Sequence, residues 1–306
     1  MSLKTFATTL GVFALLCYGC GGDSGGHDAQ TTNQNARVPT ETQIANLTYT
    51  GIYEGQPVTL RDGRYEGEPF VEGGASRPTV EWVDWFYGFG DLTGDGNDDA
   101  VVFLVENSGG SGTRLYIAVV STQNGQPADM GTALVGDRPQ VRSFDIADGK
   151  VHLDIVEQGP EDAACCPTQL ARKEWGLRDG SLVEVAAEIT GSLSLEVLLE
   201  TEWILTHFNI GEPVSAEPEI TITFEGEKIS GSSGCNRYFT TIEETSPGKI
   251  RIGVLASSRK TCPEAIEQTE YFYTLRLARI NSYSFLMGNL ALGWRSEDGW
   301  HGTMLF

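Results

Sequence analysis

The segment at residues 228–241, "KISGSSGCNRYFTT", places a cysteine beside an amide, a cation and a phenol, after a run of Gly and Ser. A thiolate at Cys235 could act as a nucleophile if a histidine base and an orienting group lay next to it. His207 and His301, the histidines of this part of the chain, stand in no motif that would supply such a base. We therefore predict no catalytic residue here and expect Cys235 to be paired with another cysteine.

Beyond the N-terminal segment the chain holds four cysteines: Cys165, Cys166, Cys235 and Cys262. Cysteines of exported proteins are usually paired, and four of them allow three pairings. We favour Cys235–Cys262 with Cys165–Cys166, because this scheme keeps each bond within one domain. The adjacent pair could instead bind a thiophilic metal or be redox-active. None of these four cysteines has a C-x-x-C spacing and no histidine is close to the adjacent pair in sequence, which argues against zinc.

The segment "DLTGDGNDD" has the spacing of a calcium-binding loop, with a glycine at the sharp turn. The candidate ligands at positions 1, 3, 5, 7 and 9 are Asp91, Thr93, Asp95, the carbonyl of Asn97, and Asp99. The loop resembles the short loops of FG-GAP repeats and dockerins. Position 12 is Val102, so the bidentate glutamate of an EF-hand is missing. Two interpretations follow: a weak calcium site, or a hairpin held by Asx turns that needs no ion.

Composition restricts the class of protein. The chain has 306 residues, 40% of them hydrophobic, which is enough for about two globular domains. Its net charge of −21 argues against nucleic acid and anionic membrane surfaces as partners, because both need clustered Lys and Arg. Such acidity instead favours solubility and the attraction of cations.

The N-terminus has the pattern of an export signal. Residues 1–19 contain Lys4 and then an apolar run that is too short to span a bilayer. The following "LLCYGC" resembles a bacterial lipobox, in which Cys20 would be lipidated, although Cys17 stands where leucine is usual. We predict a lipid-anchored protein of the outer membrane that faces the periplasm, with a soluble periplasmic protein as the alternative. Residues 20–46 are polar and are predicted to form a flexible tether.

The body of the chain reads as mainly β. Asp-Gly dipeptides at 62–63, 148–149 and 179–180 separate segments of alternating polarity, which is a hairpin signal. Residues 47–190 are therefore predicted to form one antiparallel β domain. A second domain at 198–306 also alternates, except for "TCPEAIEQTEYFYTLRLARI". There a capping box of Thr261 and Glu264 and an apolar stripe predict one amphipathic helix on a sheet.

Residues 198–306 resemble the META/HslJ family of small bacterial envelope domains. The resemblance rests on "TEWILT", "ISGSSGCNRYF" and "IRIGVLASSRKTC", followed by the helix with Glu270 and Leu277 and by the closing strands. It implies a curved antiparallel β structure with one helix. It also implies an association with heat-inducible lipoproteins and novobiocin resistance, but no activity or ligand. The N-terminal region resembles an uncharacterised domain of exported bacterial proteins through "GDLTGDGNDDAVV", "NSGGSGTRLYIAVV" and "CCPT".

The sequence thus predicts two antiparallel β domains, with α+β character in the second, in a non-catalytic lipoprotein of the cell envelope. Its function would be that of an accessory or binding module linked to stress or antibiotic tolerance. The expected partners are the membrane, through the lipid, and an envelope protein or small ligand. A calcium-dependent adhesion or inhibitor protein and an envelope enzyme are the alternatives.

Replacing Cys20 by serine removes the thiol that a lipid anchor requires. We expect Cys20→Ser to move the protein from the membrane fraction to the soluble periplasm, as measured by cell fractionation and immunoblotting. A Cys17→Ser variant serves as the control and should stay with the membrane. Unchanged membrane association of the Cys20→Ser variant would contradict the lipid assignment.

Overall fold

The computed structural model describes residues 38–69, 71, 73–110, 112–163 and 165–306. These described residues belong to one compact unit. The predicted signal, the lipidation site Cys20 and most of the predicted tether lie outside the described residues. No helix in the described part of the chain is both long and apolar enough to cross a membrane.

The folded structure begins earlier than the predicted end of the tether at residue 46. Thr40 caps the short helix α1 (Glu41–Ile44) in a capping box with Gln43. Ile44 is fully buried, and its carbonyl accepts a hydrogen bond from the Tyr49 hydroxyl at 3.0 Å. The predicted tether boundary is therefore wrong at its C-terminal end. The predicted tether is polar in composition, but it contains the apolar residue Ile44, whose burial orders the turn around it.

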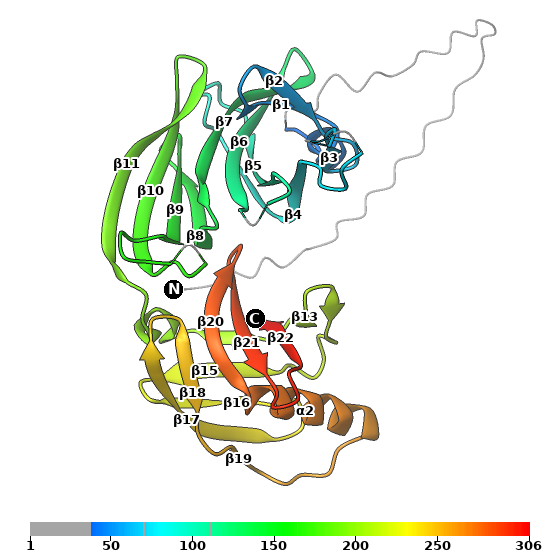
Figure 1. The fold of residues 1–306 in the computed structure, drawn as a ribbon, viewed down its shortest axis with the longest axis vertical. Helices are drawn as coiled ribbons and strands as arrows, with labels where there is room; N and C mark the ends of the chain where they lie inside the picture. The colour runs from blue at the N-terminus through cyan, green and yellow to red at the C-terminus, as the bar shows by residue number, and fades with distance from the viewer. Residues whose placement is uncertain (1–37, 70, 72, 111, 164) are drawn as a thin grey trace, which may run out of the picture. The chain divides into compact units, whose positions relative to one another are not determined.

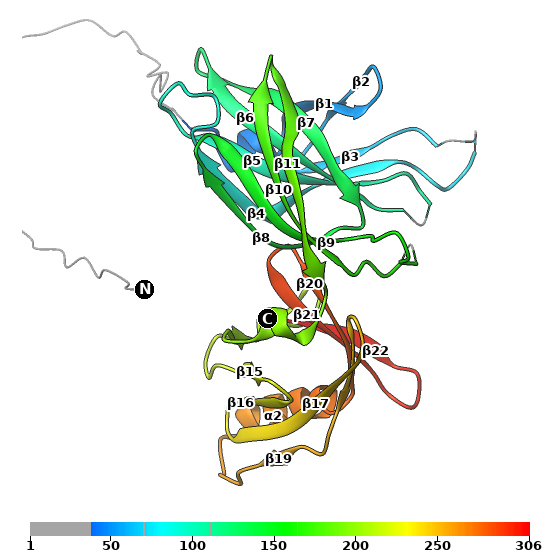
Figure 2. The ribbon, with the colours of Figure 1, turned by 90° about the vertical axis from the view of Figure 1, so that its left-hand side faces the viewer.

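Residues 48–192 form a β-sandwich, here called the N-terminal sandwich (Figures 1 and 2). Its strands are β1 (Thr48–Tyr53), β2 (Gln56–Thr59), β3 (Arg64–Glu66), β4 (Thr79–Gly90), β5 (Asp99–Asn107), β6 (Arg114–Gln123), β7 (Gln126–Asp137), β8 (Gln140–Ala147), β9 (Lys150–Glu157), β10 (Gln169–Arg178) and β11 (Ser181–Ser192). They form an antiparallel five-stranded sheet, β3 to β7 in order, a four-stranded sheet, β8 to β11 in order, and the hairpin β1–β2.

The five-stranded sheet is covered on both faces. One face packs against the four-stranded sheet through residues such as Phe103, Ile117 and Trp175. The other face is covered by α1 and the β1–β2 hairpin, with Tyr49 and Leu104 in that second core. A strand covered on both sides is apolar at nearly every position. This explains why β5 carries an unbroken apolar run rather than an alternating one.

The Asp-Gly dipeptides form the tight turns that the sequence predicted. Asp148 and Gly149 have φ values of 53° and 69°, and they join β8 to β9 in direct register from Ala147 to Lys150. Positive φ at both central residues matches the twist of a two-residue hairpin, which is why Asp-Gly is favoured there. The dipeptides at 62–63 and 179–180 have the same conformation.

Residues 195–305 form one strongly curved antiparallel sheet with helices, here called the C-terminal sheet (Figure 1). Its elements are η1 (Leu195–Leu198), β12 (Glu202–Ile204), β13 (His207–Asn209), β14 (Glu212–Pro213), β15 (Thr221–Glu225), β16 (Lys228–Ser232), β17 (Arg237–Ser246), β18 (Lys249–Ile252), β19 (Ala256–Ser257), α2 (Glu264–Leu277), β20 (Ile280–Leu286), β21 (Asn289–Arg295) and β22 (His301–Leu305). The strand order is β12-β15-β16-β17-β18-β20-β21-β22-β13-β14, with β19 beside β17. The predicted mainly antiparallel β fold is confirmed.

The helix α2 lies where the sequence predicted it, but it begins differently. Tyr273 and Leu277 are buried in the core of the C-terminal sheet, as the apolar stripe indicated. Pro263 is the N-cap residue and no side chain caps the helix, so the predicted capping box of Thr261 and Glu264 is wrong. Pro263 lacks an N–H and its φ of −55° suits a helix start, so the N-cap lies two residues after the predicted Thr261.

The hairpin β20–β21 also contacts the N-terminal sandwich. Met287, at its turn, is buried among the apolar residues of the sandwich core. The N–H of Gly288 donates to the carbonyl of Val141 at 3.0 Å, and the N–H of Phe285 donates to Oε1 of Gln140 at 2.9 Å. The two sheet systems therefore share buried surface rather than only a connecting strand.

Candidate functional site

The Gly-Ser run of the opening motif ends β16 and leads into the turn between β16 and β17. Gly234 has a φ of +93°, a conformation that favours glycine. At Gly231, a Cβ atom would lie 2.0 Å from the carbonyl oxygen of Thr221 and 2.8 Å from the Tyr238 hydroxyl. Any larger residue at 231 would separate β16 from β15. These glycines are therefore required by backbone geometry and not by a ligand.

A carboxylate on α2 organises this turn. Oε1 of Glu270 accepts a hydrogen bond from the Ser233 hydroxyl and another from the Asn236 backbone N–H at 3.1 Å. Oε2 accepts a hydrogen bond from the Asn236 side-chain amide at 2.9 Å. Ser233 is fully buried and Asn236 is 6% exposed, so these bonds form largely away from water. The turn is thereby fastened to the middle of the helix.

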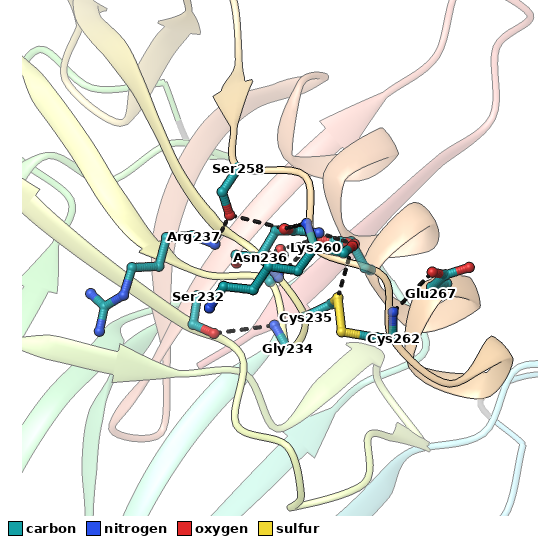
Figure 3. The surroundings of a disulfide bond; sticks show 11 residues. Ser232, Gly234, Cys235, Asn236, Arg237, Ser258, Lys260, Cys262 and Glu267 are labelled. Carbon is teal, nitrogen blue, oxygen red and sulfur yellow. Dashed lines mark hydrogen bonds between the residues drawn. A yellow bond between two sulfur atoms is a disulfide. The ribbon is translucent and has the colours of Figure 1, made fainter.

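The other end of the Asn236 side chain fixes the approach to the helix. Its Oδ1 accepts a hydrogen bond from the Ser258 hydroxyl at 2.9 Å and another from the Lys260 N–H at 2.7 Å. Figure 3 shows Asn236 between these residues, while Arg237 points away from them. The amide of Asn236 thus uses both its donor and its acceptor to join three segments. We name Ser233, Asn236, Ser258 and Glu270 the Glu270 network.

A disulfide bond lies beside the Glu270 network. Cys235 and Cys262 are bonded, with 6.0 Å between their Cα atoms (Figure 3). The N–H of Cys262 donates to Oε1 of Glu267 at 3.0 Å, which ties the segment before α2 to the first turn of the helix. The predicted pairing of Cys235 with Cys262 is present. The cysteine of the opening motif is therefore a covalent link between the β16–β17 turn and the helix.

Two buried tyrosines complete the contact between β17 and α2. The Tyr238 and Tyr273 hydroxyls lie 2.6 Å apart, and Tyr238 donates to the Thr221 carbonyl at 2.8 Å. Burial raises the pKa of both phenols above their ordinary value. A phenol with a raised pKa stays neutral at physiological pH and is a poor base. This pair supports packing and hydrogen bonding, and it offers no activated oxygen.

The predicted pair Cys165–Cys166 is also bonded, in an exposed loop between β9 and β10. The loop is organised by Asp162, whose carboxylate accepts hydrogen bonds from the N–H of Gly159 at 2.8 Å and from the N–H and hydroxyl of Thr168. These bonds, that from Gly159 first, lower the pKa of the Asp162 carboxyl. The metal-binding alternative for the two cysteines would require this bond to be reduced.

The predicted calcium ligands are held in one loop, but their carboxylates do not converge. In the described residues no group of three or more His, Cys, Asp or Glu side chains is arranged to hold a metal ion. Asp91 and Asp95 instead accept hydrogen bonds from N–H groups within the loop. These bonds are the Asx turns of the second interpretation, and they order the loop.

The sequence interpretation did not assign a role to Glu270. It lies four residues after Ile266 and three before Tyr273, on the same helical stripe that carries Leu277. An acid on the apolar stripe of a helix is a signal that could have been used, because a carboxylate there must find donors. Which donors it finds depends on a turn more than 30 residues earlier in the chain.

Comparison with known proteins finds a family match for one part of the chain. The META domain family model matches residues 196–301, which confirms the predicted resemblance for this region. The Glu270 network and the Cys235–Cys262 disulfide both lie within the matched residues. No curated protein and no solved structure matches the chain.

Replacing Glu270 by glutamine should destabilise the protein. A glutamine side chain would place its own N–H group against one of the groups that now donate hydrogen bonds to Glu270. We expect Glu270→Gln to lower the free energy of unfolding by roughly 1.5–3 kcal/mol, the range for hydrogen bonds to charged groups. Chemical denaturation measures this change. The matched control is Glu264→Gln at an exposed helix position, which should change it by less than about 0.5 kcal/mol. Equal effects of the two variants would contradict the role of Glu270.

The two disulfides should differ in their contributions to stability. The Cys235–Cys262 bond spans a sequence separation of 27, whereas the Cys165–Cys166 bond spans 1. In the chain-entropy account, removing the first by a Cys235→Ser and Cys262→Ser double variant should cost about 3–4 kcal/mol. The Cys165→Ser and Cys166→Ser double variant is the control and should cost much less, since it closes almost no loop. Denaturation of the exported proteins measures both, and recovery of free thiols at 235 and 262 would refute the pairing.

Proposed function

We propose that this protein is a non-catalytic lipoprotein of the cell envelope whose META region acts as an accessory or binding module. The match of residues 196–301 to the META family supports this class. The expected association of that family with heat stress and novobiocin tolerance motivates the biological role. The predicted export signal and lipidation at Cys20 motivate the outer-membrane location.

The non-catalytic part of the proposal rests on the bonds that the polar groups of the motif at residues 228–241 already make. The sulfur of Cys235 is bonded to Cys262, and both ends of the Asn236 amide and both oxygens of Glu270 are engaged in hydrogen bonds. Neither His207 nor His301 hydrogen-bonds to this network: their ring nitrogens lie near Thr206 and the Gly299 carbonyl. A nucleophilic mechanism would need a thiolate and a base, and this arrangement favours neither.

The outer face of the C-terminal sheet offers a surface for binding. Along β17, Tyr238 and Thr240 point into the core, and Arg237 and Phe239 alternate with them towards solvent. Phe239 is 65% exposed, and Ile204 on the edge strand β12 is 43% exposed. A groove of about 520 Å³ is lined by these outward residues of β17 together with hydroxyls such as Thr223 and Ser230. An exposed aromatic ring beside a cation and hydroxyl groups suits a partner with both apolar and polar groups.

Complementation of a deletion strain tests the proposal. Survival in novobiocin and after heat shock should be restored by the wild-type protein and lost with Phe239→Ser, because the exposed ring is removed without disturbing the core. The matched control is Ile210→Ser, which alters another exposed apolar residue, and it should still complement. Both variants must be recovered from the membrane fraction at wild-type abundance.

The purified protein should show no turnover of generic ester and peptide substrates. Turnover that disappears in a Cys235→Ser variant would overturn the non-catalytic proposal and favour an envelope enzyme. Equal complementation by Phe239→Ser and wild type would contradict the assignment of binding to the outer face of the C-terminal sheet.

A further inference from the structure

The loop between β4 and β5 and the first residue of β5 each contain a buried side-chain oxygen atom without a hydrogen-bond partner. This loop, residues 91–98, is closed by the pairing of Gly90 with Asp99 and is anchored by the buried Leu92. It belongs to the N-terminal sandwich and shares no residue with the META region. Its role is therefore a separate question from the proposed binding function.

Two of its carboxylates are satisfied by the loop itself. Oδ1 of Asp91 accepts hydrogen bonds from the N–H groups of Gly94 and Asp95, and Oδ2 accepts one from Gly96. Oδ1 of Asp95 accepts hydrogen bonds from the N–H and side-chain amide of Asn97. The backbone of the loop is thus held in place by its own side chains.

Asp99 is different because it is buried and only half satisfied. Its side chain is 1% exposed. Oδ2 accepts hydrogen bonds from the N–H of Leu92 at 2.9 Å and the N–H of Thr93 at 2.8 Å. Oδ1 has no partner, although it is shielded from solvent. A buried carboxylate oxygen without a donor is unfavourable, and such groups in folded proteins point to an additional ion or water.

The second unpartnered oxygen belongs to the same loop. Oγ1 of Thr93 is also buried and makes no hydrogen bond. Thr93 and Asp99 are connected directly, since the Thr93 N–H donates to the Asp99 carboxylate. Both unused atoms are oxygens that can donate electron pairs, and one belongs to a carboxylate. A carboxylate and a hydroxyl oxygen would both repel an anion, whereas each suits a hard cation.

We propose that Asp99 Oδ1 and Thr93 Oγ1 are two ligands of a low-affinity Ca²⁺ site in this loop. Oxygen ligands of this kind suit Ca²⁺, which accepts irregular arrangements of carboxylates, neutral oxygens and water. Mg²⁺ requires a nearly regular octahedron of close ligands, so it should bind less well. Because the carboxylates of Asp91 and Asp95 already accept hydrogen bonds from backbone N–H groups, few charged ligands remain for the ion. The expected dissociation constant is about 10⁻⁴–10⁻³ M, the range of extracellular modules.

A Ca²⁺ ion bound in this loop would lie where the two sheets of the N-terminal sandwich meet. A Cβ atom built at Gly149, in the β8–β9 turn, lies 3.9 Å from the Asp91 carbonyl oxygen. The loop from the five-stranded sheet therefore abuts a turn from the four-stranded sheet. An ion that fixes the loop should raise the thermal stability of the sandwich, because ligands that bind only the folded state favour it.

Calorimetric titration of the exported protein with CaCl₂, paired with thermal unfolding, tests the site. Unfolding is followed in 10 mM CaCl₂, in 10 mM MgCl₂ and in chelator, at matched ionic strength. The wild-type protein should bind Ca²⁺ and unfold at a higher temperature in Ca²⁺ than in the other two solutions. Thr93→Val keeps the side-chain shape and removes only the hydroxyl, so it should fold normally and weaken Ca²⁺ binding several-fold.

Asp99→Asn provides the stronger test, with Asp98→Asn as its control of equal charge change at an exposed neighbour. Asp99→Asn should weaken Ca²⁺ binding about tenfold or more, because affinity depends on ligand charge. Its stability in chelator should be equal to or above that of the wild type, since a partly unpaired buried charge is removed. Asp98→Asn should bind Ca²⁺ nearly as the wild type does.

Four results would overturn the site: no heat and no thermal shift in the wild type at 10 mM Ca²⁺; equal stabilisation by Mg²⁺; wild-type affinity in Thr93→Val; or equal losses in Asp98→Asn and Asp99→Asn. Should Asp99→Asn fail to fold, Thr93→Val still decides between the outcomes. None of these results bears on complementation by Phe239→Ser, so the two proposals can fail separately.

Discussion

The hydrogen bonds to the Glu270 carboxylate are the interaction on which the architecture of the META region, residues 196–301, depends. A charged group on the inner side of a helix must be met by donors, and the turn between β16 and β17 supplies them from Ser233 and Asn236. Meeting this requirement fixes the position of the turn, and the turn fixes Asn236. Asn236 then holds the Ser258–Lys260 segment that leads into the helix. One carboxylate thereby organises three segments that are distant in sequence.

The disulfide reinforces the same contact by a different physical means. Hydrogen bonds to Glu270 stabilise the folded state directly, whereas the Cys235–Cys262 bond mainly restricts the unfolded chain. The two devices join the same turn to the same helix, one at its middle and one just before its start. This redundancy gives Cys235 and Asn236 of the motif a structural role, although their residue types also occur in catalytic sites. Both side chains are already occupied by these bonds.

Carboxylates organise turns throughout the chain, and the atoms they leave unused distinguish structural from ligand-binding roles. Asp162 and Glu270 use both oxygens to accept hydrogen bonds from N–H or hydroxyl groups. Asp99 uses only one oxygen and buries the other without a partner. The difference cannot be inferred from residue type. It follows from how many donors the surrounding backbone presents and from whether water can reach the remaining oxygen.

The sequence by itself determined the strands, most of the turns and the helix, because alternation, Asp-Gly pairs and the Tyr273–Leu277 stripe are local properties of the chain. The cysteine pairing followed from the placement of the cysteines within the predicted domains. Only the tertiary structure decided what Glu270, Asn236 and Asp99 do, because their partners come from other segments or depend on depth of burial. The same reason explains the two local errors. Ile44 needed a core formed by later strands to order the end of the predicted tether, and Pro263 took the cap position that spacing had assigned to Thr261.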